Sequence, residues 1–215
     1  MVGPVEGPPV RSVAVPATRI LLLRHGQSEW NALGRWQGQA DPPLSAVGRA
    51  QAVAASRSVG TVDAIVASDL VRAYDTALVI AGTIGAGPVV VEAALRERDA
   101  GEWSGLTRRQ IHRSWPGYLD DGRRPPGWES DDALLARVLP AVGRIAALAP
   151  GGAVLAVTHG GVVYALEAHL GLPDAGRLAN VAGRTVHVDG DRVTAGERVL
   201  LVDGDDAPVT VPSAI

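Results

Sequence analysis

The feature that most constrains the fold of this chain is the alternation of short, continuous apolar runs with longer stretches of helical spacing. Residues 20–23 and 153–157 are two such runs, and no polar residue interrupts either of them. Continuous runs are typical of strands that are covered on both faces of a sheet. Strands that alternate with helices favour a parallel arrangement. We therefore expect an α/β fold with three layers, α/β/α, around a mostly parallel central sheet.

The same pattern predicts where the individual elements lie. Further strands are expected at 62–67, 89–91 and 153–158, and the C-terminal part predicts a hairpin through Asp189 and Gly190 followed by one more strand at 198–202. Helices are expected after the capping residues Ser45, Ser68, Thr107 and Ser130, and after His159 as far as Gly171. The first of these helices should bury the apolar positions Val47, Ala50, Val53 and Ala54. Residues 115–130, rich in Pro and Gly, predict a surface loop.

Length and charge limit the organisation of the chain and its partners. With 215 residues, the chain is long enough for one sizeable core. We expect a flexible leader at 1–18 and a single domain at 19–215. The apolar runs are too short to cross a bilayer, and a formal net charge of −3 shows no basic excess. These features predict a cytoplasmic protein without a nucleic-acid or membrane partner.

Two missing residue types exclude several chemistries. All 20 basic residues are Arg, so there is no Lys to form a Schiff base or to serve a P-loop, and there is no Cys. Thiolate nucleophiles, disulfides and cysteine-ligated metals are therefore excluded. A nucleophile must come from Ser, Thr, Asp, Glu, Tyr or one of the five His residues.

Two histidines stand in the same local setting, each directly after the predicted end of an apolar strand and each followed by Gly. They are His25 and His159. Ligands of open α/β sheets bind beyond the carboxyl ends of the strands, where both imidazoles are expected. Two histidines suit either a metal or a phosphate, but the neighbouring Arg24 would repel a cation and attract a phosphate. Metal ligation would also want a third ligand, which no local motif supplies.

The segment around His25 resembles the opening motif of the histidine phosphatase superfamily, the phosphoglycerate-mutase-like enzymes. It reads LLRHGQSEWN at 22–31, and the resemblance continues in order with RWQG at 35–38, PLSAVG at 43–48, SDLVRAYDTA at 68–77, LRE at 95–97 with Gly101 and Gly105, and THGG at 158–161. One departure is GWES at 127–130, where the family commonly has GGES. The segment at 95–107 is similar to the phosphatase branch rather than to the mutases. The resemblance implies the phosphoglycerate-mutase-like form of the α/β/α fold.

The resemblance also implies a role for particular residues. His25 would be the nucleophile that becomes a phosphohistidine, with its other ring nitrogen held by a backbone carbonyl. Glu97 would donate a proton to the leaving oxygen, and His159 would bind the phosphoryl group beside His25. The substrate-binding residues would be Arg24, Asn31, Arg72, Gln37 and Gly160. Two Arg and a second His can stabilise the transferring phosphoryl group, so neither a metal nor another cofactor is expected.

These residues predict a metal-independent phosphomonoester hydrolase that acts on a small phosphorylated metabolite, such as a sugar phosphate or a phosphoglycerate derivative. One alternative is a cofactor-dependent phosphoglycerate mutase, and another is a non-catalytic phosphate-binding or scaffold module. The short loop after Gly105 and the stretch 115–130 suggest an open mouth, which favours the hydrolase. Two of these candidate site residues also have a purely structural explanation. Arg72 could pair with Asp69 or Asp75 on the surface, and Glu97 lies in a charged run. The sequence leaves open whether the protein is a monomer or a homodimer.

Overall fold

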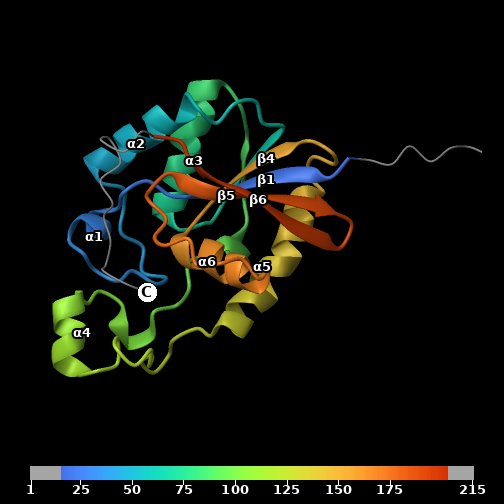
Figure 1. Cartoon of the computed structure of the whole chain (residues 1–215). Coiled ribbons are helices and arrows are strands. Elements are labelled where there is room, and N and C mark those ends of the chain that lie inside the picture. The colour runs from blue at the N-terminus through green and yellow to red at the C-terminus, as the bar shows by residue number, and fades with distance from the viewer. Residues whose placement is uncertain (1–15, 203–215) are drawn as a thin grey trace, which may run out of the picture.

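A computed structural model describes residues 16–202 as one mixed sheet with helices on both faces (Figure 1). The strands are β1 (Thr18–Arg24), β2 (Ala64–Ala67), β3 (Val89–Val91), β4 (Ala153–Thr158), β5 (Ala182–Asp189) and β6 (Arg192–Leu200). The helices are α1 (Glu29–Ala32), α2 (Ala46–Ser56), α3 (Val71–Ile84), α4 (Arg108–Ser114), α5 (Asp131–Ala146) and α6 (Gly160–His169), with two short 3₁₀ helices, η1 (Ala93–Leu95) and η2 (Gly101–Trp103).

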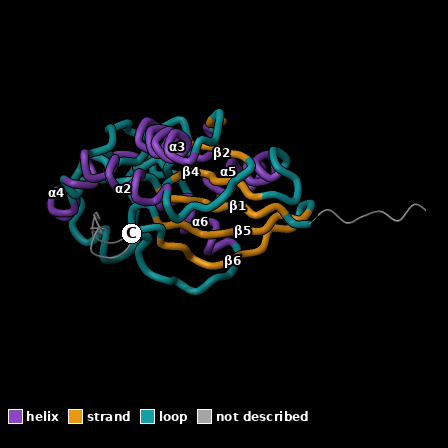
Figure 2. Tube along the Cα trace, turned by 90° about the horizontal axis from the view of Figure 1, so that it is seen from above, coloured by secondary structure: helices purple, strands orange, loops and turns teal. Residues whose placement is uncertain are grey.

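The strand order is β3-β2-β4-β1-β5-β6, which can be followed across Figure 2 from β2 to β6. Strands β1, β2, β3 and β4 pair in parallel, whereas β5 is antiparallel to β1 and β6 is antiparallel to β5. Strand β4 lies between β1 and β2, although it follows both in the sequence. The carboxyl ends of these three strands therefore meet at one edge of the sheet, where ligands of such folds bind.

The alternation of side chains along β1 divides the core into two layers. Ile20 and Leu22 pack in a cluster with side chains of α5 and α6, whereas Leu21 and Leu23 pack in a second cluster with side chains of α2 and α3. Successive residues of a strand point to opposite faces, so a continuous apolar run fills both layers. This arrangement confirms the expected α/β/α architecture.

Three of the predicted capping residues begin helices as expected. The side chains of Ser45 and Ser130 accept hydrogen bonds from the backbone of Gly48 and Ala133, and Thr107 forms a capping box with Gln110. Such caps satisfy amide groups that the first turn of a helix leaves without partners. The start of α2, α4 and α5 is therefore set by local sequence.

The prediction for Ser68 was wrong. Helix α3 begins later, with Leu70 at its N-cap position and no side-chain cap, and it ends at Gly85 in the left-handed region with φ 68°. Ser68 is buried, and its hydroxyl group is used elsewhere, as described below.

The predicted apolar face of α2 was also wrong. Val47 and Val53 are exposed, and the buried residues of the helix are Gly48, Gln51, Ala52, Ala55 and Ser56. Gln51 accepts a hydrogen bond from the backbone N–H of Gln27, and a Cβ atom on Gly48 would lie 2.0 Å from the Gln27 carbonyl oxygen. The rotation of α2 thus follows its fit against the loop after β1, which the apolar pattern does not encode.

Two boundaries differ from the expectation. Arg198 belongs to β6, the second strand of the hairpin, so the segment at 198–202 is not a separate strand. Thr18, the last residue of the expected leader, is buried in β1, while residues 1–15 lie outside the described part of the chain. Within residues 16–202, no helix has the length and apolar character needed to cross a membrane.

Candidate active site

The predicted histidines lie side by side at the carboxyl edge of the sheet. His25 follows β1 and His159 follows the neighbouring β4, and their ring centroids are 5.1 Å apart in an edge-to-face arrangement. The backbone N–H of His25 donates to Thr158 O at 3.0 Å, so the loop after β1 continues the sheet pairing for one more residue. Ser68 follows β2 on the other side of β4, where its hydroxyl contacts His159. The strand order places the three side chains in a row.

A hydrogen bond to the backbone determines which nitrogen of His25 carries the proton. Nδ1 lies 2.6 Å from the carbonyl oxygen of Gly26, and a carbonyl can only accept, so Nδ1 is the protonated nitrogen. Nε2 then keeps its lone pair and accepts a hydrogen bond from Arg72 Nε at 3.2 Å. Burial lowers the pKa of His25 well below its usual 6.5, and the charges of Arg72 and Arg24 lower it further. His25 is therefore a neutral imidazole whose unprotonated Nε2 shares its lone pair with the Arg72 Nε–H group.

His159 is buried and also neutral. Its pKa lies well below 6.5, mainly because burial disfavours the charged form and then because of repulsion from Arg72. Nε2 lies 3.0 Å from Ser68 Oγ, whereas Nδ1 has no hydrogen-bond partner among the described residues. A buried polar atom without a partner is costly and usually marks a ligand or a water site. His159 Nδ1 is thus a candidate donor to a bound oxygen next to His25.

Two buried guanidinium groups supply positive charge. Arg72 donates through Nη1 to Ala40 O at 2.7 Å and through Nη2 to Gly38 O at 2.9 Å, and Arg24 donates through Nη1 to Leu178 O at 2.5 Å. Burial lowers the pKa of Arg72 to about 10 and also lowers that of Arg24. The surface pairing of Arg72 with Asp69 or Asp75 is therefore wrong, because Arg72 is buried against His25. Two desolvated cations beside neutral histidines favour an anionic ligand.

Glu97 lies close enough to both arginines for its charge to act on them. It is half-buried at the first turn of α6, where Oε2 accepts a hydrogen bond from Gly161 N at 3.2 Å. Oε1 accepts from the backbone N–H of Arg98 at 2.7 Å. A Cβ atom on Gly161 would lie 2.2 Å from Oε1, so a larger residue at 161 would displace the Glu97 carboxyl group. The structure therefore brings Glu97 to the edge that carries both histidines.

The remaining predicted residues surround this centre. Asn31 Oδ1 accepts from Ser28 N at 3.1 Å, and Gln37 Oε1 accepts from Ser28 Oγ at 2.7 Å. Both amide NH₂ groups are then the ends that can turn to a ligand. Gly160 begins α6 beside Arg24, because a Cβ atom there would lie 3.9 Å from Arg24 Nε.

Sequence reasoning missed several residues that hold the site. Ser68 contacts His159, Asn180 Nδ2 donates to His25 O at 2.9 Å, and Arg137 binds the backbone on both sides of Arg96. Ser68 lies in the SDLVRAYDTA motif and immediately after a strand, and this position is the signal that could have identified it as a site residue. Asn180 and Arg137 stand in no motif, and only the folded chain brings them to the site.

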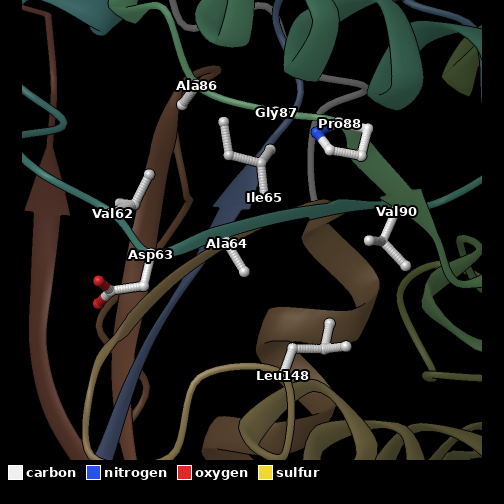
Figure 3. A pocket seen from close by; sticks show the side chains of 9 residues that line it. All are labelled: Val62, Asp63, Ala64, Ile65, Ala86, Gly87, Pro88, Val90 and Leu148. Carbon is white, nitrogen blue, oxygen red and sulfur yellow. The ribbon is translucent and has the colours of Figure 1, made fainter.

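Two other features lie away from this centre. Trp36 and Trp103 are buried with Ile111 in a cluster of their own, so they form a wall rather than an open mouth. A pocket at the opposite edge of the sheet is lined by the beginnings of β2 and β3, by the segments just before them and by Leu148, and its lining is mostly apolar with Asp63 as the one charged side chain (Figure 3). Within residues 16–202, no group of three or more His, Asp or Glu is arranged to hold a metal ion.

Comparisons with known proteins give a consistent result. The family described as the histidine phosphatase superfamily (branch 1) matches residues 20–196. The chain is 43% identical over 169 residues to glucosyl-3-phosphoglycerate phosphatase of Mycobacterium tuberculosis, which covers 72% of this chain and 75% of that protein. It is 38% identical over 182 residues to metal-independent phosphoserine phosphatase of Arabidopsis thaliana, covering 80% and 76% of the two chains. The solved structure of mycobacterial glucosyl-3-phosphoglycerate phosphatase with VO₃ has a TM-score of 0.73 at 37% identity, and the match covers 83% of this chain and 97% of that chain.

Proposed function

The chain belongs to the histidine phosphatase superfamily and is a phosphatase, and from that premise we propose that it hydrolyses phosphomonoesters through a phosphohistidine on Nε2 of His25. The observation that carries this proposal is the state of His25. The Gly26 carbonyl holds the proton on Nδ1, and burial keeps the imidazole neutral. An imidazole attacks through an unprotonated nitrogen, and Nε2 is that nitrogen.

In the first step, the Nε2 lone pair of His25 forms a bond to phosphorus while the bond from phosphorus to the leaving oxygen breaks. Glu97, in its protonated form, gives its proton to that oxygen. Arg24, Arg72 and His159 Nδ1 bind the phosphoryl oxygens and stabilise the charge that spreads over them. Asn31, Gln37 and the backbone of Gly160 are the further donors around the substrate.

In the second step, water attacks the phosphohistidine and the bond from phosphorus to Nε2 breaks. The Glu97 carboxylate takes a proton from this water, which restores both residues for another cycle. Glu97 thus gives one proton to the alcohol product in the first step and gains one proton from water in the second.

The proposed substrate is a small phosphate ester, with phosphoglycerate derivatives and sugar phosphates as the first class to test. This choice rests on relatives named for glucosyl-3-phosphoglycerate and for phosphoserine. Both substrates carry a carboxylate near the phosphate. We further propose a cytoplasmic protein, because charged metabolites of this kind are retained inside cells. Sedimentation of the purified chain decides between a monomer and a homodimer.

Trapping the intermediate tests the proposal directly. Wild-type protein quenched during turnover of a ³²P-labelled ester should carry a label that is lost in acid and kept in alkali, as a phosphoramidate is. His25→Ala should carry none and should turn over near background. His169→Ala, which changes an exposed histidine at the end of α6, is the matched control and should label normally. An acid-stable label, or a label retained in His25→Ala, would contradict the assignment of His25.

A second test addresses metal dependence. The two guanidinium groups supply the charge that a metal ion gives in other phosphatases, and the neutral His159 adds a hydrogen bond, so activity should persist in excess EDTA. Vanadate can adopt five-coordinate geometry at the same donors and should inhibit. Activity that EDTA removes and Mg²⁺ or Zn²⁺ restores would refute the metal-independent mechanism.

A further inference from the structure

We propose that Arg137, on helix α5, is a positioning residue that sets the place of the Glu97 carboxyl group for proton transfer. This inference rests on the proposed role of Glu97. It assigns a function to a residue that stands outside every motif discussed above.

The contacts of Arg137 are concentrated on the segment that carries Glu97. Nη1 donates to Ala94 O at 2.6 Å and to Arg96 O at 2.8 Å, and Nη2 donates to Glu97 O at 3.0 Å. Ala94 lies in the 3₁₀ helix η1, and Arg96 and Glu97 follow in the stretch before η2, which no helix or strand holds. One side chain thus binds three carbonyl groups within four residues, including that of Glu97 itself.

Arg137 is itself held in place by Glu129, which lies in the GWES segment at 127–130, where this sequence departs from the family's GGES. Arg137 Nε lies 2.8 Å from Glu129 Oε1, and Nη2 lies 2.8 Å from Glu129 Oε2. The exposed fractions of the two side chains are only 23% and 14%. Burial raises the pKa of Glu129, but hydrogen bonds and charge from Arg137 outweigh this and leave the pKa lowered. Glu129 is therefore ionised and fixes the orientation of the guanidinium plane.

Glu129 also binds the residues that follow Glu97 in the same loop. Its Oε2 accepts from Asp99 N at 3.1 Å, and its backbone N–H donates to Asp99 O at 3.1 Å. Arg98 Nη1 donates to the Glu129 carbonyl at 2.7 Å. The backbone on both sides of Glu97 is thus fastened near the start of α5 by the Arg137–Glu129 pair, by these backbone contacts of Glu129 and by an ion pair of Arg98 with Asp131.

The place of the Glu97 carboxyl group matters for its proposed role. Its oxygens accept from Gly161 N at 3.2 Å and from Arg98 N at 2.7 Å, so the carboxyl group is oriented by backbone on both sides. A general acid must reach the leaving oxygen at hydrogen-bond distance, and misplacement by about 1 Å can cost about 10²-fold in rate. A lysine at 137 offers a point charge and cannot reproduce the planar fork that binds Glu129 and three carbonyls.

A purely structural role for Arg137 predicts a different outcome from a positioning role. Loss of a structural contact lowers the fraction of folded enzyme and so reduces all activities equally. Displacement of the general acid matters more as the leaving oxygen becomes more basic, because a p-nitrophenolate leaves with little protonation whereas an alkoxide requires it. The ratio of kcat/KM for an alkyl ester to kcat/KM for an aryl ester therefore distinguishes the two roles, because kcat/KM excludes the later hydrolysis of the phosphohistidine that both esters share.

The experiment compares glycerol 3-phosphate with p-nitrophenyl phosphate in folded, soluble variants. Arg137→Met should lose about 10²-fold in kcat/KM on the alkyl ester and less than about tenfold on the aryl ester. Arg144→Met is the matched control, because Arg144 lies two turns further along α5 and pairs with Glu92 at the start of the same loop. That variant should leave the ratio unchanged. In the Glu97→Gln background, Arg137→Met should change the ratio no further.

Each outcome decides the inference. Equal losses of Arg137→Met on both esters, with a changed ratio for Glu97→Gln, would overturn the positioning role and leave the proposed function intact. A ratio that Glu97→Gln leaves unchanged would instead refute the acid role of Glu97, and the inference with it. Where Arg137→Met does not fold, Arg137→Lys and Glu129→Gln replace it and must shift the ratio in the same direction; an unchanged ratio in both overturns the inference.

Discussion

Two buried imidazoles beside two guanidinium groups can exist at neutral pH only because neither imidazole is charged. Burial, followed by repulsion from Arg72, keeps the pKa values of His25 and His159 well below 6.5. This arrangement makes the stability of the folded state depend on pH. The unfolded chain then binds protons at both histidines near their ordinary pKa, whereas the folded chain does not.

We predict that the folded state loses stability as the pH falls from about 7 toward the lower pKa values of the native histidines. Each histidine should contribute a slope of up to about 1.4 kcal/mol per pH unit, because the unfolded state binds more protons in that window. Urea unfolding between pH 5.5 and 7.5 measures this slope. His25→Gln and His159→Gln should each reduce it, and the exposed His169→Gln should not. An unchanged slope in the first two variants would contradict the neutral state.

Ser68 has a second consequence at the residue scale. If His159 donates through Nδ1, Ser68 must donate to Nε2, so the hydroxyl selects the tautomer. We predict that Ser68→Ala lowers kcat by about tenfold or more and costs about 1–3 kcal/mol in stability, because Nε2 loses its buried partner. Side-chain ¹⁵N shifts of His159 report the tautomer directly. A tautomer and a kcat that match those of the wild type would show that Ser68 is only a packing residue.

At the scale of elements, helices α2 and α3 contact each other on one face of the sheet, but they differ in whether a glycine can be replaced by a larger residue. Gly48 of α2 is pressed against the Gln27 carbonyl in the loop that follows His25, whereas Gly82 of α3 has no atom within 4 Å of its would-be Cβ. The same substitution should therefore have opposite effects in the two helices.

Gly48→Ala should destabilise the protein by about 1–3 kcal/mol or more and lower activity, because the backbone of the His25 loop must move. Gly82→Ala should stabilise it by about 0.5–1 kcal/mol, because alanine loses less conformational freedom in a helix. Gly143→Ala in α5 also meets open space and serves as a second comparison. Chemical unfolding and turnover of p-nitrophenyl phosphate measure both effects. A neutral Gly48→Ala would show that the loop after β1 is more compliant than its contacts indicate.

At the scale of the whole molecule, the fate of the phosphohistidine separates a phosphatase from a mutase. A mutase must keep a phosphoglycerate bound and exclude water, whereas a phosphatase needs a positioned water. With 3-phosphoglycerate and catalytic 2,3-bisphosphoglycerate, we predict release of inorganic phosphate and little 2-phosphoglycerate. A coupled phosphate assay together with NMR of the products measures both. Isomerisation that outruns phosphate release would instead establish the mutase.

The sequence by itself determined the parts of this protein that depend on neighbours along the chain. The continuous runs at 20–23 and 153–157 indicated strands covered on both faces, Ser45, Thr107 and Ser130 began helices as expected, and two His-Gly pairs marked strand ends. Each of these signals acts within a few residues, because hydrogen-bond caps and side-chain periodicity are local properties. The resemblance to a family supplied the roles of the site residues.

Only the tertiary structure decided which surfaces meet. The insertion of β4 between β1 and β2 places Ser68 against His159, and it is not encoded in any single segment. The rotation of α2 was set by Gly48 against a backbone carbonyl and not by its valines, and Arg137 reaches Glu97 across 40 positions of the chain. These contacts join residues that are distant in sequence, so their geometry depends on how the completed layers pack, and no local pattern carries that information.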